Sequence, residues 1–126
     1  MPCSYFIDKE RRIVFSAGWD RLTFAEAKAH GEQLLSDPDF NPDFNQLIDA
    51  SAVTAMDISI DEAKMLARRA IVSPTSRRAF VATDPSIFGM GRLMGAYDEI
   101  ERARDKAGVF YDRDAALQWL GSGILP

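Results

Sequence analysis

The sequence has a single cysteine, a single histidine and no long apolar run. Cys3 has no internal partner for a disulfide, which suits a reducing compartment. No stretch approaches the roughly 20 apolar residues of a transmembrane helix. The segment MPCSYFIDKERRIVF has charged residues from position 8 onward and lacks the apolar core of a signal peptide. We therefore expect a cytoplasmic protein without a membrane-spanning segment.

An excess of positive charge is also lacking. Fifteen lysines and arginines stand against 19 acidic residues, so the net charge is −4. Nucleic acids require a concentrated basic surface, and we expect no nucleic-acid partner. A length of 126 residues with 47% hydrophobic side chains is typical of one soluble domain with its own core. We expect a single domain over residues 1–126.

The residue combinations that carry catalysis or bind metals are missing. His30 has no second imidazole or thiolate pattern with which to bind a transition metal. No G-x-S-x-G motif presents a serine nucleophile. The acidic segment 37–43 matches alternate positions of a calcium loop, but Pro42 occupies the position of its obligatory glycine. We expect no catalytic residue, no metal and no cofactor, and hence a protein that is not an enzyme.

Apolar patterns and helix-capping signals predict nine elements in the order ββαβαβαβα. Strands are expected at residues 4–8, 12–18, 44–50, 77–83 and 109–111. Helices are expected to begin after the capping residues Thr23, Ser59, Asp84 and Asp112. The third helix should run to about residue 103, and the last should end at Leu120, before Gly121. This order predicts an α/β fold with a mixed, mostly parallel sheet, an N-terminal antiparallel hairpin and four helices.

Several polar side chains follow the predicted strands. In open parallel sheets, ligands bind beyond the carboxyl ends of the strands. The residues expected along that rim are Trp19, Asp49, Ser51, Thr83, Asp84 and Asp112. Asp84 and Asp112 are also predicted helix caps, whereas Asp49 and Ser51 have no such structural explanation.

The predicted third helix contains three glycines, Gly89, Gly91 and Gly95. Each costs a helix interior about 1 kcal/mol relative to alanine. One interpretation is close packing against a neighbour. The other is a mobile helix that covers an apolar ligand, with adaptable methionines in its lining. For the second interpretation, the expected ligand-binding residues are Trp19, Phe88, Met90, Gly91, Met94 and Tyr97.

The stretch QLIDASAVTAMDISIDEA resembles the phosphoacceptor region of STAS domains, where D-L-S-G ends a strand and D-S-S-G opens a helix. Asp49 and Ser51 match the first group, and Asp57 and Ser59 match the second. The whole chain more closely resembles the bacterial SpoIIAA-like family, on the motifs DPDFNPDF, LIDASAVT, SRRAFVA and FGMGRLM. That family is similar in architecture to anti-sigma-factor antagonists and to CRAL-TRIO lipid-transfer domains. The resemblance implies a SpoIIAA-like fold.

The sequence departs from the STAS pattern at the residue that is phosphorylated. That serine falls at Ile58, and the following glycine falls at Ile60. Ser59 keeps a hydroxyl, but its predicted capping box with Glu62 would occupy it.

Two functions remain open. The first is a binding module that holds a small apolar or lipid-like ligand, or associates with a membrane surface through the third helix. The second is a protein-interaction regulator of the antagonist type, acting through Asp49, Ser51, Asp57 and Ser59 without the usual phosphoacceptor. A homodimer is also expected, because the initial hairpin leaves sheet edges to cover.

Overall fold

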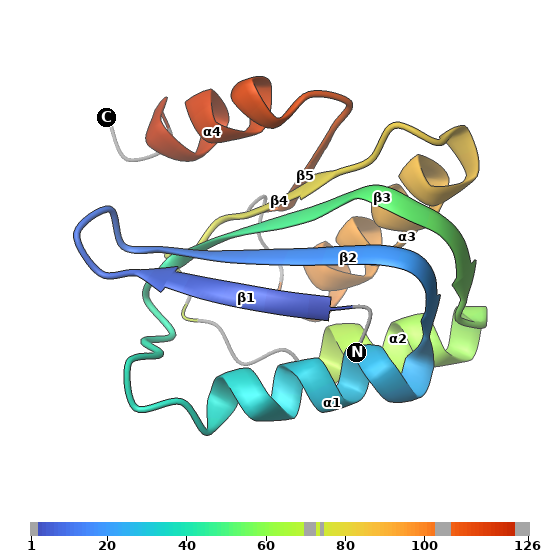
Figure 1. Ribbon diagram of the computed structural model, residues 1–126, viewed down its shortest axis with the longest axis horizontal. Helices are drawn as coiled ribbons and strands as arrows, with labels where there is room; N and C mark the ends of the chain where they lie inside the picture. The colour runs from blue at the N-terminus through green and yellow to red at the C-terminus, as the bar shows by residue number, and fades with distance from the viewer. Residues whose placement is uncertain (1–2, 70–72, 74, 103–106, 123–126) are drawn as a thin grey trace.

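A five-stranded sheet forms the centre of the molecule (Figure 1). The computed structural model describes residues 3–69, 73, 75–102 and 107–122, without the side chains of 67–69, 94, 95, 97–102 and 122. The strands are β1 (Cys3–Asp8), β2 (Ile13–Thr23), β3 (Asn45–Asp57), β4 (Arg78–Val81) and β5 (Ala107–Phe110). The helices are α1 (Phe24–Leu35), α2 (Ile60–Arg69), α3 (Pro85–Arg102) and α4 (Arg113–Ser122). The predicted element order and fold class are confirmed.

The strand order explains where the helices lie. The strands are arranged as β1-β2-β3-β4-β5, with β1 antiparallel to β2 and all later neighbours parallel. Each of the three crossovers therefore moves one strand in the same direction. Because such crossovers are right-handed, α1, α2 and α3 fall on one face of the sheet. The last helix, α4, has no following strand and folds back over the opposite face (Figure 1).

The two faces carry different cores. On the α4 face, Leu47 and Val81 of the sheet pack against Leu120 in one continuous cluster. On the other face the buried residues form two clusters. One is centred on Val14 and Leu34, and the other contains Ala50, Val53, Ala82 and Ile87. The hydrophobic face under α1, α2 and α3 is therefore divided.

The third strand is longer than the sequence analysis predicts. A strand was expected at 44–50, but β3 continues to Asp57. Its second half pairs only with β2 among the described strands, since β4 ends opposite Asp49. The register between β2 and β3 shifts twice, and Asp20 takes a positive φ of 58° at the second shift. Valine and threonine in SAVTAMD suit this extended, twisted ribbon, and such irregularities strengthen its twist.

The predicted helix starts are confirmed at the level of hydrogen bonds. Thr23 and Glu26 form a complete capping box at α1. Ser59 Oγ accepts from Glu62 N at 3.1 Å, and Glu62 Oε1 accepts from Ser59 N at 2.9 Å. Asp84 Oδ1 accepts from Ser86 N at 2.9 Å. The prediction for the last helix end is wrong, because α4 continues through Gly121 to Ser122.

Candidate functional site

A cavity of about 250 Å³ lies between α1 and the sheet, where the core under the crossover helices is divided. Leu34 borders it from one cluster, and Ala50 and Val53 border it from the other. The cavity is partly open to solvent, so it is a pocket of the surface rather than an enclosed void.

Strand alternation determines which residues reach the cavity. Ser16 of β2, Ile48 of β3 and Phe80 of β4 line it. Their neighbours Leu47 and Ala79 point the other way and belong to the α4 cluster. This is the period of two that a pleated strand imposes. Apolar groups make up most of the cavity wall.

Gly31 lines the cavity from the middle of α1. A Cβ built at this position would meet no other atom within 4 Å, so no neighbour requires a glycine there. A glycine in a helix interior costs about 1 kcal/mol relative to alanine. The absent side chain of Gly31 therefore leaves the cavity larger at some expense in helix stability.

A polar pair forms part of the same wall. His30 Nε2 lies 3.0 Å from Ser16 Oγ, and both residues line the cavity. Ser16 is only 8% exposed. The edge of the Tyr5 ring meets the imidazole at a centroid distance of 5.6 Å. Burial lowers the pKa of His30, so its ring is uncharged at neutral pH.

Charged side chains of both signs lie at the cavity wall. Lys28 and Arg78 carry positive charge and Glu32 carries negative charge, whereas the Asp49 carboxylate lies on the α4 face and pairs with Arg113. Glu32 and Leu35 are exposed, which places an opening of the cavity beside the C-terminal half of α1. The approach is thus polar, whereas the interior is mostly apolar.

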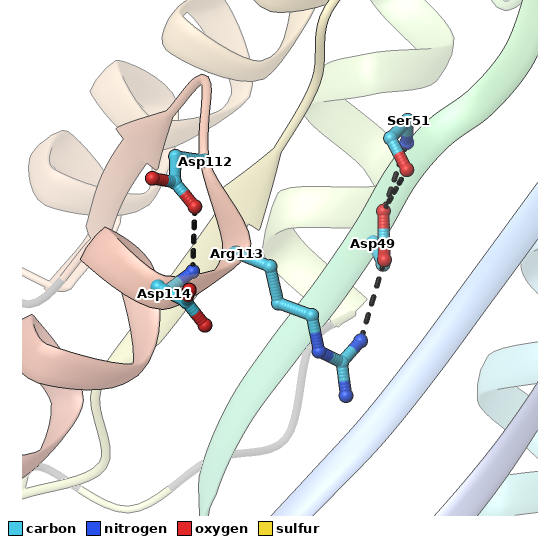
Figure 2. Close-up of polar contacts among 5 residues, drawn as sticks. All are labelled: Asp49, Ser51, Asp112, Arg113 and Asp114. Atoms are coloured by element: carbon cyan, nitrogen blue, oxygen red, sulfur yellow. Dashed lines mark hydrogen bonds and ion pairs between the residues drawn. The ribbon is translucent and has the colours of Figure 1, made fainter.

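Asp49 and Ser51 take part in a satisfied polar cluster at the start of α4 (Figure 2). Asp49 Oδ1 accepts hydrogen bonds from Ser51 N at 2.9 Å and from Ser51 Oγ at 2.6 Å. Asp49 Oδ2 lies 3.3 Å from Arg113 Nη1. Asp112 Oδ1 accepts from Asp114 N at 2.8 Å and caps α4, as predicted. The carboxylate of Asp49 is therefore paired by neighbouring groups of the fold.

The four residues matched to the STAS motif do not form one continuous rim. Eight positions separate Asp49 from Asp57, about 26 Å of strand at roughly 3.3 Å per residue. Asp57 forms an exposed ion pair with Arg21 at 3.6 Å. Ser59 is occupied by its capping box. Ile58 is 7% exposed and lines the cavity, so the position of the usual phosphoacceptor is part of the core.

Four of the six residues expected to bind a ligand lie outside this cavity. Trp19, Phe88, Met90 and Gly91 do not line the cavity beneath α1. The Phe88 ring stacks on Tyr111 at a centroid distance of 3.9 Å. A Cβ at Gly91 would overlap the Phe80 ring, so α3 needs this glycine to approach the sheet.

Two other residues of that set, Met94 and Tyr97, have side chains outside the described part of the structure. The mobility of α3 remains a prediction.

Ser16, His30 and Gly31 are site residues that the sequence analysis did not select. Two signals could have pointed to them. Ser16 is a small polar residue inside the apolar run IVFSAG, and Gly31 interrupts an otherwise good helix-forming sequence. Neither signal identifies a cavity without the placement of α1 over β2.

The part of the chain that the structure describes contains no cluster of three His, Cys, Asp or Glu side chains able to hold a metal ion. Within the same ranges, every helix is too short or too polar to cross a membrane.

The mixed sheet with three helices on one face and one on the other defines an α/β domain of SpoIIAA-like fold. The chain is similar to the crystal structure of an uncharacterised DUF3478-family protein with a SpoIIAA-like fold from Shewanella loihica PV-4. The TM-score is 0.63 at 16% identity, and the match covers 94% of this chain and 93% of that chain. No protein-family model and no curated protein matches the chain. The likeness establishes the fold, which the sequence resemblance had implied.

Proposed function

We propose that this protein is a non-enzymatic binding module that holds a small apolar molecule in the cavity beneath α1. The observation that carries the proposal is the cavity itself, about 250 Å³ with a mostly apolar wall. Ligand sites are typically concave and apolar, with a few polar groups that fix orientation. Ser16 and His30 are polar groups of this kind.

The size of the cavity restricts the ligand. An apolar cavity of about 150 Å³ is enough to bind benzene. Typical pockets for drug-sized molecules begin at about 300 Å³. A volume of 250 Å³ therefore suits a molecule of about one or two rings or a short branched chain. A complete long-chain lipid would have to extend through the opening beside Leu35.

The proposal is tested by filling the cavity from α1. Tetralin, a two-ring hydrocarbon, is titrated into wild-type protein and into Gly31→Leu by calorimetry. The leucine side chain would enter the space beside Gly31 and should weaken tetralin binding at least tenfold. Gly89→Leu is the matched control, since Gly89 is also helical with no atom within 4 Å of its Cβ position, but does not line the cavity.

The control should bind tetralin as wild type does. If wild-type protein fails to bind tetralin and related hydrocarbons, or if Gly31→Leu binds them equally well, the proposed site is wrong. Native mass spectrometry of gently purified protein provides the complementary test, because a retained small molecule should be lost in Gly31→Leu and kept in Gly89→Leu.

A protein-interaction regulator is the second candidate. The observation in its favour is two exposed apolar side chains on α2, Ile60 beside Ser59 at 57% and Met65 at 44%. A protein partner that covers Ile60 should be lost in an Ile60→Asp variant. A stoichiometric partner recovered with wild type and absent with Ile60→Asp would favour this function over the first.

A further inference from the structure

The Ser16–His30 pair has more hydrogen-bonding capacity than it uses. A neutral imidazole has one donor and one acceptor, and a serine hydroxyl has one donor and two acceptor positions. The 3.0 Å contact uses one donor and one acceptor, whichever tautomer is present. One donor, either His30 Nδ1–H or Ser16 Oγ–H, is therefore left over.

The described residues supply no second partner for this pair. Within them, the Ser16 hydroxyl and the His30 ring hydrogen bond only to each other. Ser16 is buried and His30 is half-buried, and a donor left without an acceptor in such a site is destabilising. Because both side chains line the cavity, an acceptor atom of a bound molecule would satisfy the remaining donor.

The mostly apolar wall indicates that this molecule is neutral. Of the charged side chains at the wall, Glu32 and Arg78 already interact with other groups of the protein, and Lys28 lies one helical turn from Glu32, whereas the Asp49 carboxylate is on the other face of the sheet. Burying an ionised group in an apolar site is costly unless a counter-charge pairs with it. The shifted pKa of His30 is consistent with a site that disfavours charge.

We infer that the ligand is a neutral, mostly apolar molecule with one oxygen atom, a ketone, alcohol or phenol, whose oxygen is bound by the Ser16–His30 pair. This inference rests on the proposed function, because it requires an occupied cavity. It adds the chemical class of the ligand and the residues that orient it.

The test compares two ligands of one shape, 1-tetralone and tetralin, on wild-type protein and on the double variant Ser16→Ala/His30→Leu. Replacing both partners of a hydrogen bond by apolar groups is often nearly neutral for folding, which makes the double variant suitable. The ratio of the tetralin Kd to the tetralone Kd should fall about threefold to tenfold in the double variant, the usual worth of one neutral hydrogen bond.

A second readout reports directly on the imidazole. His30 is the sole histidine of the chain, so its two ring nitrogens give an unambiguous ¹⁵N spectrum. Saturation with tetralone should shift a ring-nitrogen resonance of His30 by more than saturation with tetralin. A role of the pair in folding alone would not produce that difference.

The outcomes separate the inference from the proposed function. If the double variant binds tetralin well but leaves the Kd ratio unchanged, the oxygen anchor is wrong and the cavity proposal survives. If wild-type protein binds neither molecule, both fail. If tetralin-1-carboxylate binds more tightly than tetralone at pH 7.5, the ligand class is an anion and the inference is overturned.

Discussion

The two faces of the sheet are packed in different ways. On the α4 face, Leu47 and Leu120 are fully buried, and a Cβ at Gly108 would lie within 2.9 Å of the Phe110 ring. On the opposite face, the space beside Gly31 is open and continues into a cavity of about 250 Å³. The same strands therefore support a filled core on one side and a hollow one on the other.

The difference follows from how each face is covered. One helix, α4, packs on β3, β4 and β5 of its face, where its side chains join one continuous apolar cluster. Three crossover helices share the other face and form two separate apolar clusters. The gap between these clusters lies under α1. The filled core and the proposed ligand site therefore lie on opposite sides of one sheet.

The largest expected effect compares two neighbours of β3. Leu47→Ala should lower the free energy of unfolding by about 3 kcal/mol, because it leaves a void in a filled core. Ile48→Ala should cost clearly less, since the Ile48 side chain already borders the cavity. Chemical denaturation of both variants measures the difference. Equal losses would mean that the two faces are packed alike.

Gly91→Ala gives the next largest effect. Its methyl group would overlap the Phe80 ring, and overpacking of this kind costs about 1–3 kcal/mol. Gly89→Ala in the same helix meets no atom and should be neutral or stabilising by up to about 1 kcal/mol. Thermal denaturation distinguishes the two. A stabilised Gly91→Ala variant would show that α3 does not rest on Phe80 and would favour the prediction that α3 is mobile.

We expect helix caps to contribute equally to stability on both faces, so that the two faces differ in their packing alone. Ser59→Ala at α2 and Asp112→Ala at α4 should each cost about 1 kcal/mol. Ser59→Asp should be nearly neutral, because aspartate caps equally well. Denaturant midpoints provide the measurement. Phosphate placed on Ser59 by a kinase, with loss of a bound protein partner, would instead show that this serine is a switch.

The smallest expected effect is a dependence of stability on pH that arises from His30 on the cavity face. The pKa of His30 is lowered in the folded protein, so the unfolded chain binds this proton first as pH falls. The contribution of neutral His30 to stability is complete above about pH 6.5 and decreases as pH falls toward the lower pKa of the folded state. Between pH 7.5 and about 5.5, stability should fall for wild type and less for Ser16→Ala/His30→Leu. Identical slopes would contradict the buried, neutral state of His30.

Local signals made much of the fold predictable. The capping residues Thr23, Ser59 and Asp84 mark the starts of α1, α2 and α3, and the βα alternation specifies parallel pairing. The length of β3 was missed because residues 51–57 form a two-stranded ribbon whose pairing depends on β2. Propensity within the segment alone does not show that partner.

The candidate site was less predictable for a physical reason. Asp49 and Ser51 stood out as polar residues after a strand, yet the fold pairs them with each other and with Arg113. A cavity is a space left between elements, so it depends on where α1 and the sheet meet. Gly31 and Ser16 are informative only once that placement is known.

Cys3 allows the most direct measurement of the central claim that the cavity takes up a ligand. It is the sole cysteine of the chain, and it lines the cavity. Its alkylation rate therefore reports whether the cavity is occupied. Saturating tetralin should slow alkylation of wild type and of Gly89→Leu severalfold, and should have no effect on Gly31→Leu. An alkylation rate in wild type that does not respond to tetralin, despite measurable tetralin binding, would place the ligand elsewhere and contradict the account.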